Sequence, residues 1–180
     1  MIFDKINTCL GFLKLLIAKV FYGKRIKIEG LVKIKSNFKI FISKDSALEI
    51  KKGTRIRENF YLRCEKGAKI YIGKNCFINN NANIVSLNQI FLGDNVSIGP
   101  NVVIYDHDHD FKNNFKEFIS EPIKIGNNVW IGANVTILKG VKIGDNCIIA
   151  ANTLITKDVK SNTIVREKKE IIEKETIIRK

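Results

Sequence analysis

Residues 125–155 read IGNNVWIGANVTILKGVKIGDNCIIAANTLI, and the regular spacing in this stretch decides the fold. An aliphatic residue returns at every sixth position, and a small or β-branched residue follows each of them four positions later. An α-helix drifts by about 240° over six residues, so it would not gather these side chains on one face. The aliphatic positions are Ile125, Ile131, Ile137, Ile143, Ile149 and Ile155.

The same period continues upstream in four groups of three aliphatic residues, which brings the aligned positions to eighteen. Short strands that meet at turns place every sixth residue at the same point of a core, and three such hexads make one triangular coil. The turns read Gly-Asn-Asn, Gly-Asp-Asn, Gly-Pro-Asn and Ala-Ala-Asn, which suit tight corners. We therefore predict a solenoid of about six coils. The upstream groups are Ile28, Ile34 and Ile40; Ile50, Ile56 and Leu62; Ile72, Ile78 and Ile84; and Leu92, Ile98 and Ile104.

One long interruption, YDHDHDFKNNFKEFISEPIK at residues 105–124, breaks the repeat. We expect it to leave the coil as a loop, and long loops in compact domains are usually functional. It holds both histidines of the chain, His107 and His109. A neutral imidazole is a base near physiological pH, and a nearby carboxylate can fix its tautomer. The sequence leaves open which carboxylate does so: Asp108, Asp110, Glu117 or Glu121.

Composition narrows the function classes. A chain of 180 residues with 45% hydrophobic residues fits one folded domain. Its net charge is +13, of which residues 1–52 carry +8, from twelve Lys or Arg against four Asp or Glu. No nucleic-acid-binding motif accompanies this charge, so we expect no nucleic-acid partner. The four cysteines have neither CxxC spacing nor a histidine cluster, which predicts no metal site, reduced thiols (Cys76 and Cys147 in the core) and a cytoplasmic protein.

The N-terminal segment, residues 1–24, is apolar but interrupted by Lys14 and Lys19. We predict a short helix there, with two open interpretations. It could cap the open end of the solenoid, or it could rest on an anionic membrane surface, in particular the inner face of the cell membrane, helped by Lys24, Arg25 and Lys27. The apolar residues that such a helix would gather are Ile2, Ile6, Leu10, Leu13, Ile17 and Phe21.

The segments NVVIYDHDHDF (101–111) and PIKIGNNVWIGANVTILKGVKIGDNCIIAANTLITKDVKSNTIV (122–165) resemble the hexapeptide-repeat sugar O-acetyltransferases. Within that family, these segments are most similar to those of the maltose, galactoside and polysaccharide O-acetyltransferases. The resemblance implies an all-β, left-handed parallel β-helix that forms a homotrimer, uses acetyl-CoA without a metal and acetylates a carbohydrate. It suggests an N-terminal helix (1–24), the β-helix (25–160) and a C-terminal extension (161–180).

The resemblance also implies roles for single residues. His109 matches the general base of the family, with His107 as the alternative, and Asn79 matches an asparagine near the reacting carbonyl. Positions that match the CoA-binding groove are Ala133, Ala151, Thr156 and Lys157, with Arg166 or Lys168 as further phosphate contacts. Trp130 could pack on the cofactor or on a neighbouring subunit.

The acceptor site departs from the resemblance, because galactoside-type enzymes carry a carboxylate and a serine where this chain has Leu87 and Glu65. We therefore expect a cell-surface polysaccharide or its precursor. Alternatives on the same fold are an N-acetyltransferase of an amino sugar, an antibiotic acetyltransferase and a non-enzymatic solenoid. A γ-type carbonic anhydrase is disfavoured, since its zinc needs three histidines and the chain has two.

Overall fold

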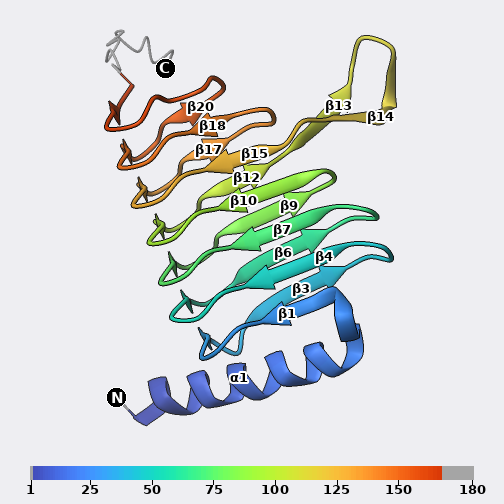
Figure 1. The fold of residues 1–180 in the computed structure, drawn as a ribbon, viewed down its shortest axis with the longest axis vertical. Coiled ribbons are helices and arrows are strands. Elements are labelled where there is room, and N and C mark those ends of the chain that lie inside the picture. The colour runs from blue at the N-terminus through green and yellow to red at the C-terminus, as the bar shows by residue number, and fades with distance from the viewer. Residues whose placement is uncertain (1, 168–180) are drawn as a thin grey trace, which may run out of the picture.

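The computed structural model describes residues 2–167, and it is a stack of triangular coils with one helix lying across its N-terminal end (Figure 1). Each coil contributes one strand to each of three parallel sheets. Sheet A contains β1 (Ile26–Ile28), β4 (Ala47–Ile50), β7 (Lys69–Ile72), β10 (Gln89–Leu92), β15 (Ile123–Ile125) and β18 (Lys142–Ile143). Sheet B contains β2 (Lys33–Ile34), β5 (Arg55–Ile56), β8 (Phe77–Ile78), β11 (Ser97–Ile98), β16 (Trp130–Ile131), β19 (Ile148–Ile149) and β21 (Ile164–Val165). Sheet C contains β3 (Phe38–Ile42), β6 (Phe60–Cys64), β9 (Asn83–Ser86), β12 (Val103–Tyr105), β17 (Thr136–Ile137) and β20 (Leu154–Ile155).

The predicted six-residue positions form the core. Of the eighteen aligned aliphatic residues, seventeen are buried, at most 8% exposed, and Ile28 is partly buried. Residues of one row stack directly: Ile84 of β9 aligns with Leu62 of β6 and with Ile104 of β12. The prediction of a left-handed parallel β-helix with six complete coils is confirmed. Strand β21 lies within the predicted C-terminal extension and adds to sheet B, and residues 168–180, with Lys168, lie outside the described part of the chain.

Asparagines in the left-handed conformation turn two of the three corners. The corner between sheets B and C (the B/C corner) has a ladder in which each Asn side chain donates to the next over 2.8–2.9 Å, and the corner between sheets A and B has another at 3.0 Å. Asparagine tolerates a positive φ better than other non-glycine residues, which explains its recurrence. The ladders are Asn59, Asn81, Asn101, Asn134 and Asn152, and Asn95, Asn128, Asn146 and Asn162, all with φ of 56–61°.

The interruption at 105–124 leaves the stack at the third corner, between sheets C and A (the C/A corner). We expected a loop, but the segment forms an antiparallel hairpin of β13 (His107–Asp110) and β14 (Asn114–Ser120), with an irregularity between His109 and Asp110. Figure 1 shows it projecting from the side of the stack near the C-terminal end. The hairpin carries three exposed phenylalanines, Phe111, Phe115 and Phe118.

Helix α1 (Ile2–Tyr22) and the short 3₁₀ turn η1 (Gly23–Arg25) cover the open end of the first coil, as one of the two interpretations predicted. Leu15 is 1% exposed beneath the helix. A β-carbon at Gly11 would come within 1.9 Å of the Ile34 carbonyl oxygen, so this close approach requires glycine. The membrane interpretation stays a prediction.

Three of the four cysteines lie in the core and one lies on the surface. Cys64, Cys76 and Cys147 are buried, as predicted for the last two, and Cys9 on α1 is exposed. Burial raises the pKa of the Cys64 and Cys76 thiols to about 11. These two thiols therefore stay protonated and unreactive at neutral pH.

The corner ladders make a testable contribution to stability. Replacing Asn146, whose φ is 57°, by valine forces a β-branched residue into the left-handed region and removes two ladder hydrogen bonds. Asn146→Gly removes the same bonds without the backbone strain. In urea unfolding at equal protein concentration, we expect the valine variant to be less stable than the glycine variant by about 1–2 kcal/mol. Equal stability of the two would show that the conformation of this corner is not what selects asparagine.

Candidate active site

A buried carboxylate anchors the base of the hairpin. Asp106 is fully buried and follows β12 on the inward side. Its Oδ2 accepts hydrogen bonds from Ser86 Oγ at 2.6 Å and from Asn88 N at 2.9 Å, and its Oδ1 accepts one from Leu87 N at 2.8 Å. These contacts tie the start of the hairpin to the preceding coil. The sequence suggested no role for Ser86 or Asn88, although the inward alternation of their strand could have indicated the pair Ser86–Asp106.

His107 lies against this anchor. Its Nδ1 is 3.3 Å from Asp106 Oδ1, its ring stacks on Tyr105 and meets Phe118 edge-on, and its side chain is only 13% exposed. Burial raises the pKa of the neighbouring Tyr105 phenol. An imidazole packed on three sides and bound to a buried carboxylate is fitted to hold the hairpin in place rather than to meet a substrate.

His109 lies farther out on the hairpin and is more open to solvent. Its Nδ1 is 2.8 Å from the carbonyl oxygen of Phe115, and its ring stacks on Phe115 at 4.5 Å and contacts Phe118 at the same centroid distance. A carbonyl oxygen only accepts hydrogen bonds, so Nδ1 must carry the proton. In the neutral ring, Nε2 is then the unprotonated nitrogen, which is the state that a general base needs.

None of the four expected carboxylates contacts the His109 ring in the described part of the chain. Asp110 instead binds Asn113, which lowers the pKa of that carboxyl, and Glu117 binds Asn114. The backbone carbonyl replaces them because the tight hairpin turn brings residue 115 directly against residue 109. The expectation of an orienting carboxylate was therefore wrong for this hydrogen bond.

A groove of about 570 Å³ runs along the outer face of sheet B at the B/C corner. Trp130, 58% exposed, lines it beside Phe77 and Ile148, and small residues form its corner side. A β-carbon on Gly132 would come within 2.6 Å of the Ala151 amide nitrogen, so adjacent backbones touch here. The corner residues of the groove are Asn79, Gly99, Pro100, Gly132, Ala133, Ala150 and Ala151.

Asn79 sits in this groove with a defined amide orientation. Its Oδ1 accepts a hydrogen bond from the Asn80 amide at 2.8 Å. Within the described residues its Nδ2 has no partner, which leaves its two N–H donors available to a ligand. Such donors could stabilise an oxyanion that forms in the groove.

The remaining predicted cofactor residues lie elsewhere. Thr156 and Lys157 are exposed at the C/A corner, in a second groove of about 480 Å³ that Leu154 and Val165 also line. The single chain thus separates the predicted residues into two sets. Asn79, Trp130, Ala133 and Ala151 share the B/C corner, whereas His107, His109, Thr156 and Lys157 belong to the C/A corner and its hairpin.

The acceptor positions that the sequence singled out also lie at the C/A corner. Glu65 occupies the corner two coils before His107, and Leu87 one coil before it. Arg63 and the Ser43 hydroxyl both bind the Glu65 carboxylate and lower its pKa, so Glu65 is ionised at neutral pH. Among the described residues, no group of three or more His, Cys, Asp or Glu side chains is placed to hold a metal ion.

Comparisons with known proteins agree with the repeat. The family model for the bacterial transferase hexapeptide (six repeats) matches residues 122–157, and that for the hexapeptide repeat of succinyl-transferase matches residues 69–106. The galactoside O-acetyltransferase of Escherichia coli K12 is 44% identical over 78 residues, which is 42% of this chain and 38% of that protein. A Saccharomyces cerevisiae protein named as a candidate acetyltransferase is 37% identical over 129 residues, 62% of this chain and 66% of that protein.

Among solved structures, a hexapeptide-repeat-containing acetyltransferase of Vibrio cholerae O1 biovar eltor, in complex with acetyl-CoA, is similar with a TM-score of 0.52 and 29% identity. The similarity covers 89% of this chain and 81% of that one. The matches to the two curated relatives, in contrast, span less than two thirds of those proteins' lengths.

The Asp106 anchor can be tested with a pair of matched variants. Asp106→Asn puts an amide donor where the surrounding groups are donors, so we expect a loss of about 1–3 kcal/mol of stability in urea unfolding. Asp108→Asn is the control, because Asp108 is exposed and an amide oxygen can still accept from His109 N. We expect that variant to stay within about 0.5 kcal/mol of the parent chain. Similar losses in both would contradict an anchoring role for Asp106.

Proposed function

Since the chain belongs to the hexapeptide-repeat transferase family, we propose that it transfers the acetyl group of acetyl-CoA to a hydroxyl of a carbohydrate. The observation that carries this proposal is the similarity over 89% of the chain to an acetyltransferase solved with acetyl-CoA. The apolar groove with a floor of small residues supports it, because a long flexible acyl donor needs a backbone that it can approach closely.

His109 is the general base of the proposed reaction. Its Nε2 takes the proton from the acceptor hydroxyl while Nδ1–H stays bound to the Phe115 carbonyl, which holds the ring in one orientation. The oxygen attacks the acetyl carbonyl and a tetrahedral intermediate forms. Its collapse breaks the carbon–sulfur bond, and the imidazolium returns the proton to the leaving CoA thiolate.

Asn79 is the donor proposed for the oxyanion of that intermediate. Asn79 lines the groove, and its Oδ1 accepts from the Asn80 amide, which leaves Nδ2 to donate. One preorganised donor of this kind is typically worth a factor of 10²–10³ in rate. Trp130, Ala133 and Ala151 would contact the CoA along the same groove, and Lys157 would meet its phosphates as a point charge.

A trimer would unite the two halves of this site. Asn79 and His109 lie at the two corners that border sheet C, so a ring of subunits with sheet C facing inward would bring the B/C corner of one chain to the C/A corner of the next. The outward side chains of sheets A and C favour sheet C as the inward face. Sheet A carries ion pairs around Lys51 and Glu49, whereas sheet C presents apolar residues such as Val85, Val103 and Leu154. The exposed phenylalanines of the hairpin would also be covered in this assembly.

The acceptor would enter beside the hairpin at the C/A corner. The ionised Glu65 and its partner Arg63 offer a hydrogen-bond acceptor and donors for sugar hydroxyl groups. We propose a cell-surface polysaccharide or its precursor as the acceptor, because the positions of Leu87 and Glu65 differ from those of the galactoside-type enzymes.

Binding and chemistry can be separated by one variant. Saturating CoA or acetyl-CoA should raise the melting temperature of the protein, because a ligand that binds only the folded state stabilises it. His109→Ala should keep this shift but lower the rate of CoA release with a panel of sugar and polysaccharide acceptors by about 10²–10⁴-fold. Trp130→Ala should reduce the thermal shift, whereas Phe91→Ala on sheet A should not. An unchanged melting temperature at millimolar CoA would refute the proposed donor.

The shared site predicts complementation between two impaired variants. Asn79→Ala and His109→Ala homotrimers should each be impaired. If they are unfolded together, mixed and refolded, some interfaces pair an intact Asn79 with an intact His109, so activity should rise above that of either variant alone. Separate refolding followed by mixing is the control. No gain after co-refolding would mean that the two residues do not act together across an interface.

A further inference from the structure

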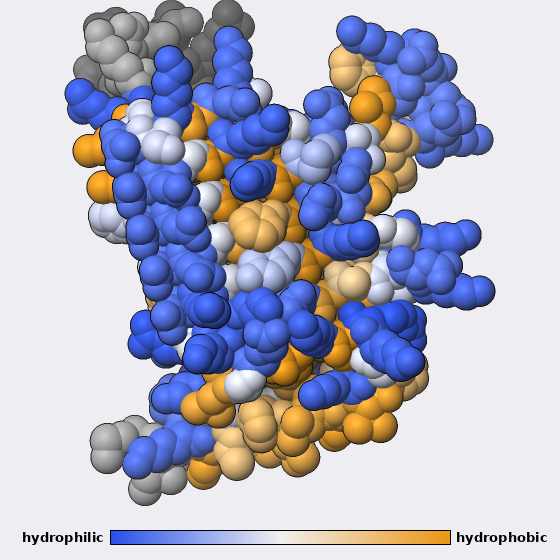
Figure 2. All heavy atoms as spheres, in the orientation of Figure 1, coloured by the Kyte–Doolittle hydropathy of each residue, from blue (hydrophilic) through white to orange (hydrophobic). Residues whose placement is uncertain are grey.

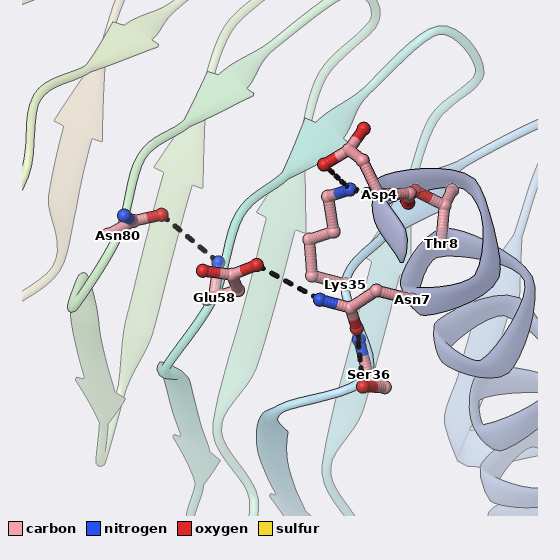
Figure 3. Close-up of polar contacts among 7 residues, drawn as sticks. All are labelled: Asp4, Asn7, Thr8, Lys35, Ser36, Glu58 and Asn80. Carbon is pink, nitrogen blue, oxygen red and sulfur yellow. Dashed lines mark hydrogen bonds and ion pairs between the residues drawn. The ribbon is translucent and has the colours of Figure 1, made fainter. Parts of the chain in front are cut away.

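Helix α1 turns its polar residues toward the solenoid. Figure 3 shows Asp4 and Asn7 directed at Lys35, Ser36 and Glu58 of the first two coils. Asn7 Oδ1 accepts from Ser36 N at 2.8 Å, and its Nδ2 donates to Glu58 Oε1 at 2.9 Å. Lys35, 5% exposed, donates to the Asp4 carbonyl at 2.9 Å and pairs with the Asp4 carboxylate, whose pKa it lowers.

The opposite side of the helix is apolar and open to solvent. At about 100° per residue, Leu13 and Val20 point directly away from the buried Gly11 and Leu15. Figure 2 shows apolar side chains gathered along the bottom of the stack, where Figure 1 draws α1. A helix at the surface of a water-soluble domain has the reverse arrangement, with its apolar stripe inward. The outward face of α1 comprises Ile6, Leu10, Leu13, Leu16, Ile17, Val20 and Phe21, which are 42–85% exposed.

We propose that the outward face of α1 docks on the surface of a lipid bilayer that contains anionic lipids. The helix is long and apolar enough to cross a membrane by length and composition alone. A crossing orientation would, however, break the contacts of Asp4, Asn7 and Lys14 with the solenoid end, where Lys14 Nζ binds the Ser36 and Phe38 carbonyls at 3.2 and 3.0 Å. The helix therefore lies in the plane of the membrane interface, with its apolar face toward the lipid chains.

Charge selects a lipid surface over a second copy of the chain. Residues 1–52 carry +8, and three of their four acidic residues, Asp4, Glu29 and Glu49, are already in ion pairs. Lys5 and Lys19 of α1 and Lys24 beside it are exposed and have no ion pair among the described residues. An anionic surface gains from these charges, whereas two such ends brought together would repel each other.

Vesicle co-sedimentation of the full chain tests the proposal. The protein should sediment with phosphatidylcholine vesicles that contain phosphatidylglycerol, less with phosphatidylcholine alone, and less at high salt. The double variant Leu13→Glu/Val20→Glu should lower the partition coefficient by more than about tenfold, since both side chains would be buried in the interface. Ile164→Glu, at an equally exposed apolar position in the last strand, is the control and should sediment like the parent chain.

Two results would overturn the proposal. One is a parent chain that stays in the supernatant with anionic vesicles, or a double variant that sediments equally well. The other is a parent chain that does not bind vesicles but forms an assembly of twice its mass in their absence, while the double variant does not form this assembly. That result would assign the face to a second copy. The melting temperature of each variant checks that it is folded.

A fluorescent label gives an independent readout. Cys9 lies on the outward side of α1 and is exposed, whereas the three other cysteines are buried, so a polarity-sensitive thiol probe should attach to Cys9 alone. Its emission should shift to the blue on addition of anionic vesicles, at lipid concentrations that match the sedimentation curve. An unshifted spectrum under conditions where the protein sediments would contradict docking through this helix.

Discussion

The bend that the backbone makes at each corner, about every six residues, is the constraint on which the rest of the structure depends. Most corners have one residue with a positive φ, and at two of the three corners this residue is asparagine in most coils, where its amide links to the coils above and below. These surface ladders keep each asparagine corner in line with the same corner of the neighbouring coils, although the number of residues per coil varies. The aliphatic residues between the aligned corners therefore stack in register.

The C/A corner is free of this constraint and carries the variable parts. Its positive-φ residues are Asp45, Gly67 and Gly140, without a ladder, so this corner tolerates different numbers of residues from coil to coil. The hairpin leaves the stack there, and the buried Asp106 ties the point of departure to the preceding coil through Ser86. The rigid B/C corner supplies the groove and the variable C/A corner supplies the base, so the reaction proposed above depends on bringing the two together.

The sequence was sufficient for the coil count and for the inward aliphatics, because both are periodic. It was insufficient for the hairpin, since the alternation His-Asp-His-Asp in β13 has no apolar face that would indicate a strand. The Phe115 carbonyl could not be found either, because a backbone group carries no sequence signal. The same limit applies to α1: its apolar face was readable, but the direction in which that face points depends on the polar contacts of Asp4 and Asn7.

The two ends of the molecule constrain the acceptor when the proposals are combined. Helix α1 lies across the first coil, and the hairpin with His109 leaves after the fourth. Parallel strands are about 4.8 Å apart and a helix is about 10 Å thick, so the coils in between and the helix itself raise the site about 25 Å above a membrane on which α1 rests. A hydroxyl at a lipid headgroup would lie too low to reach His109. A sugar several residues along a membrane-attached saccharide would lie at the right height, so this geometry favours a polymer over a glycolipid with a single sugar.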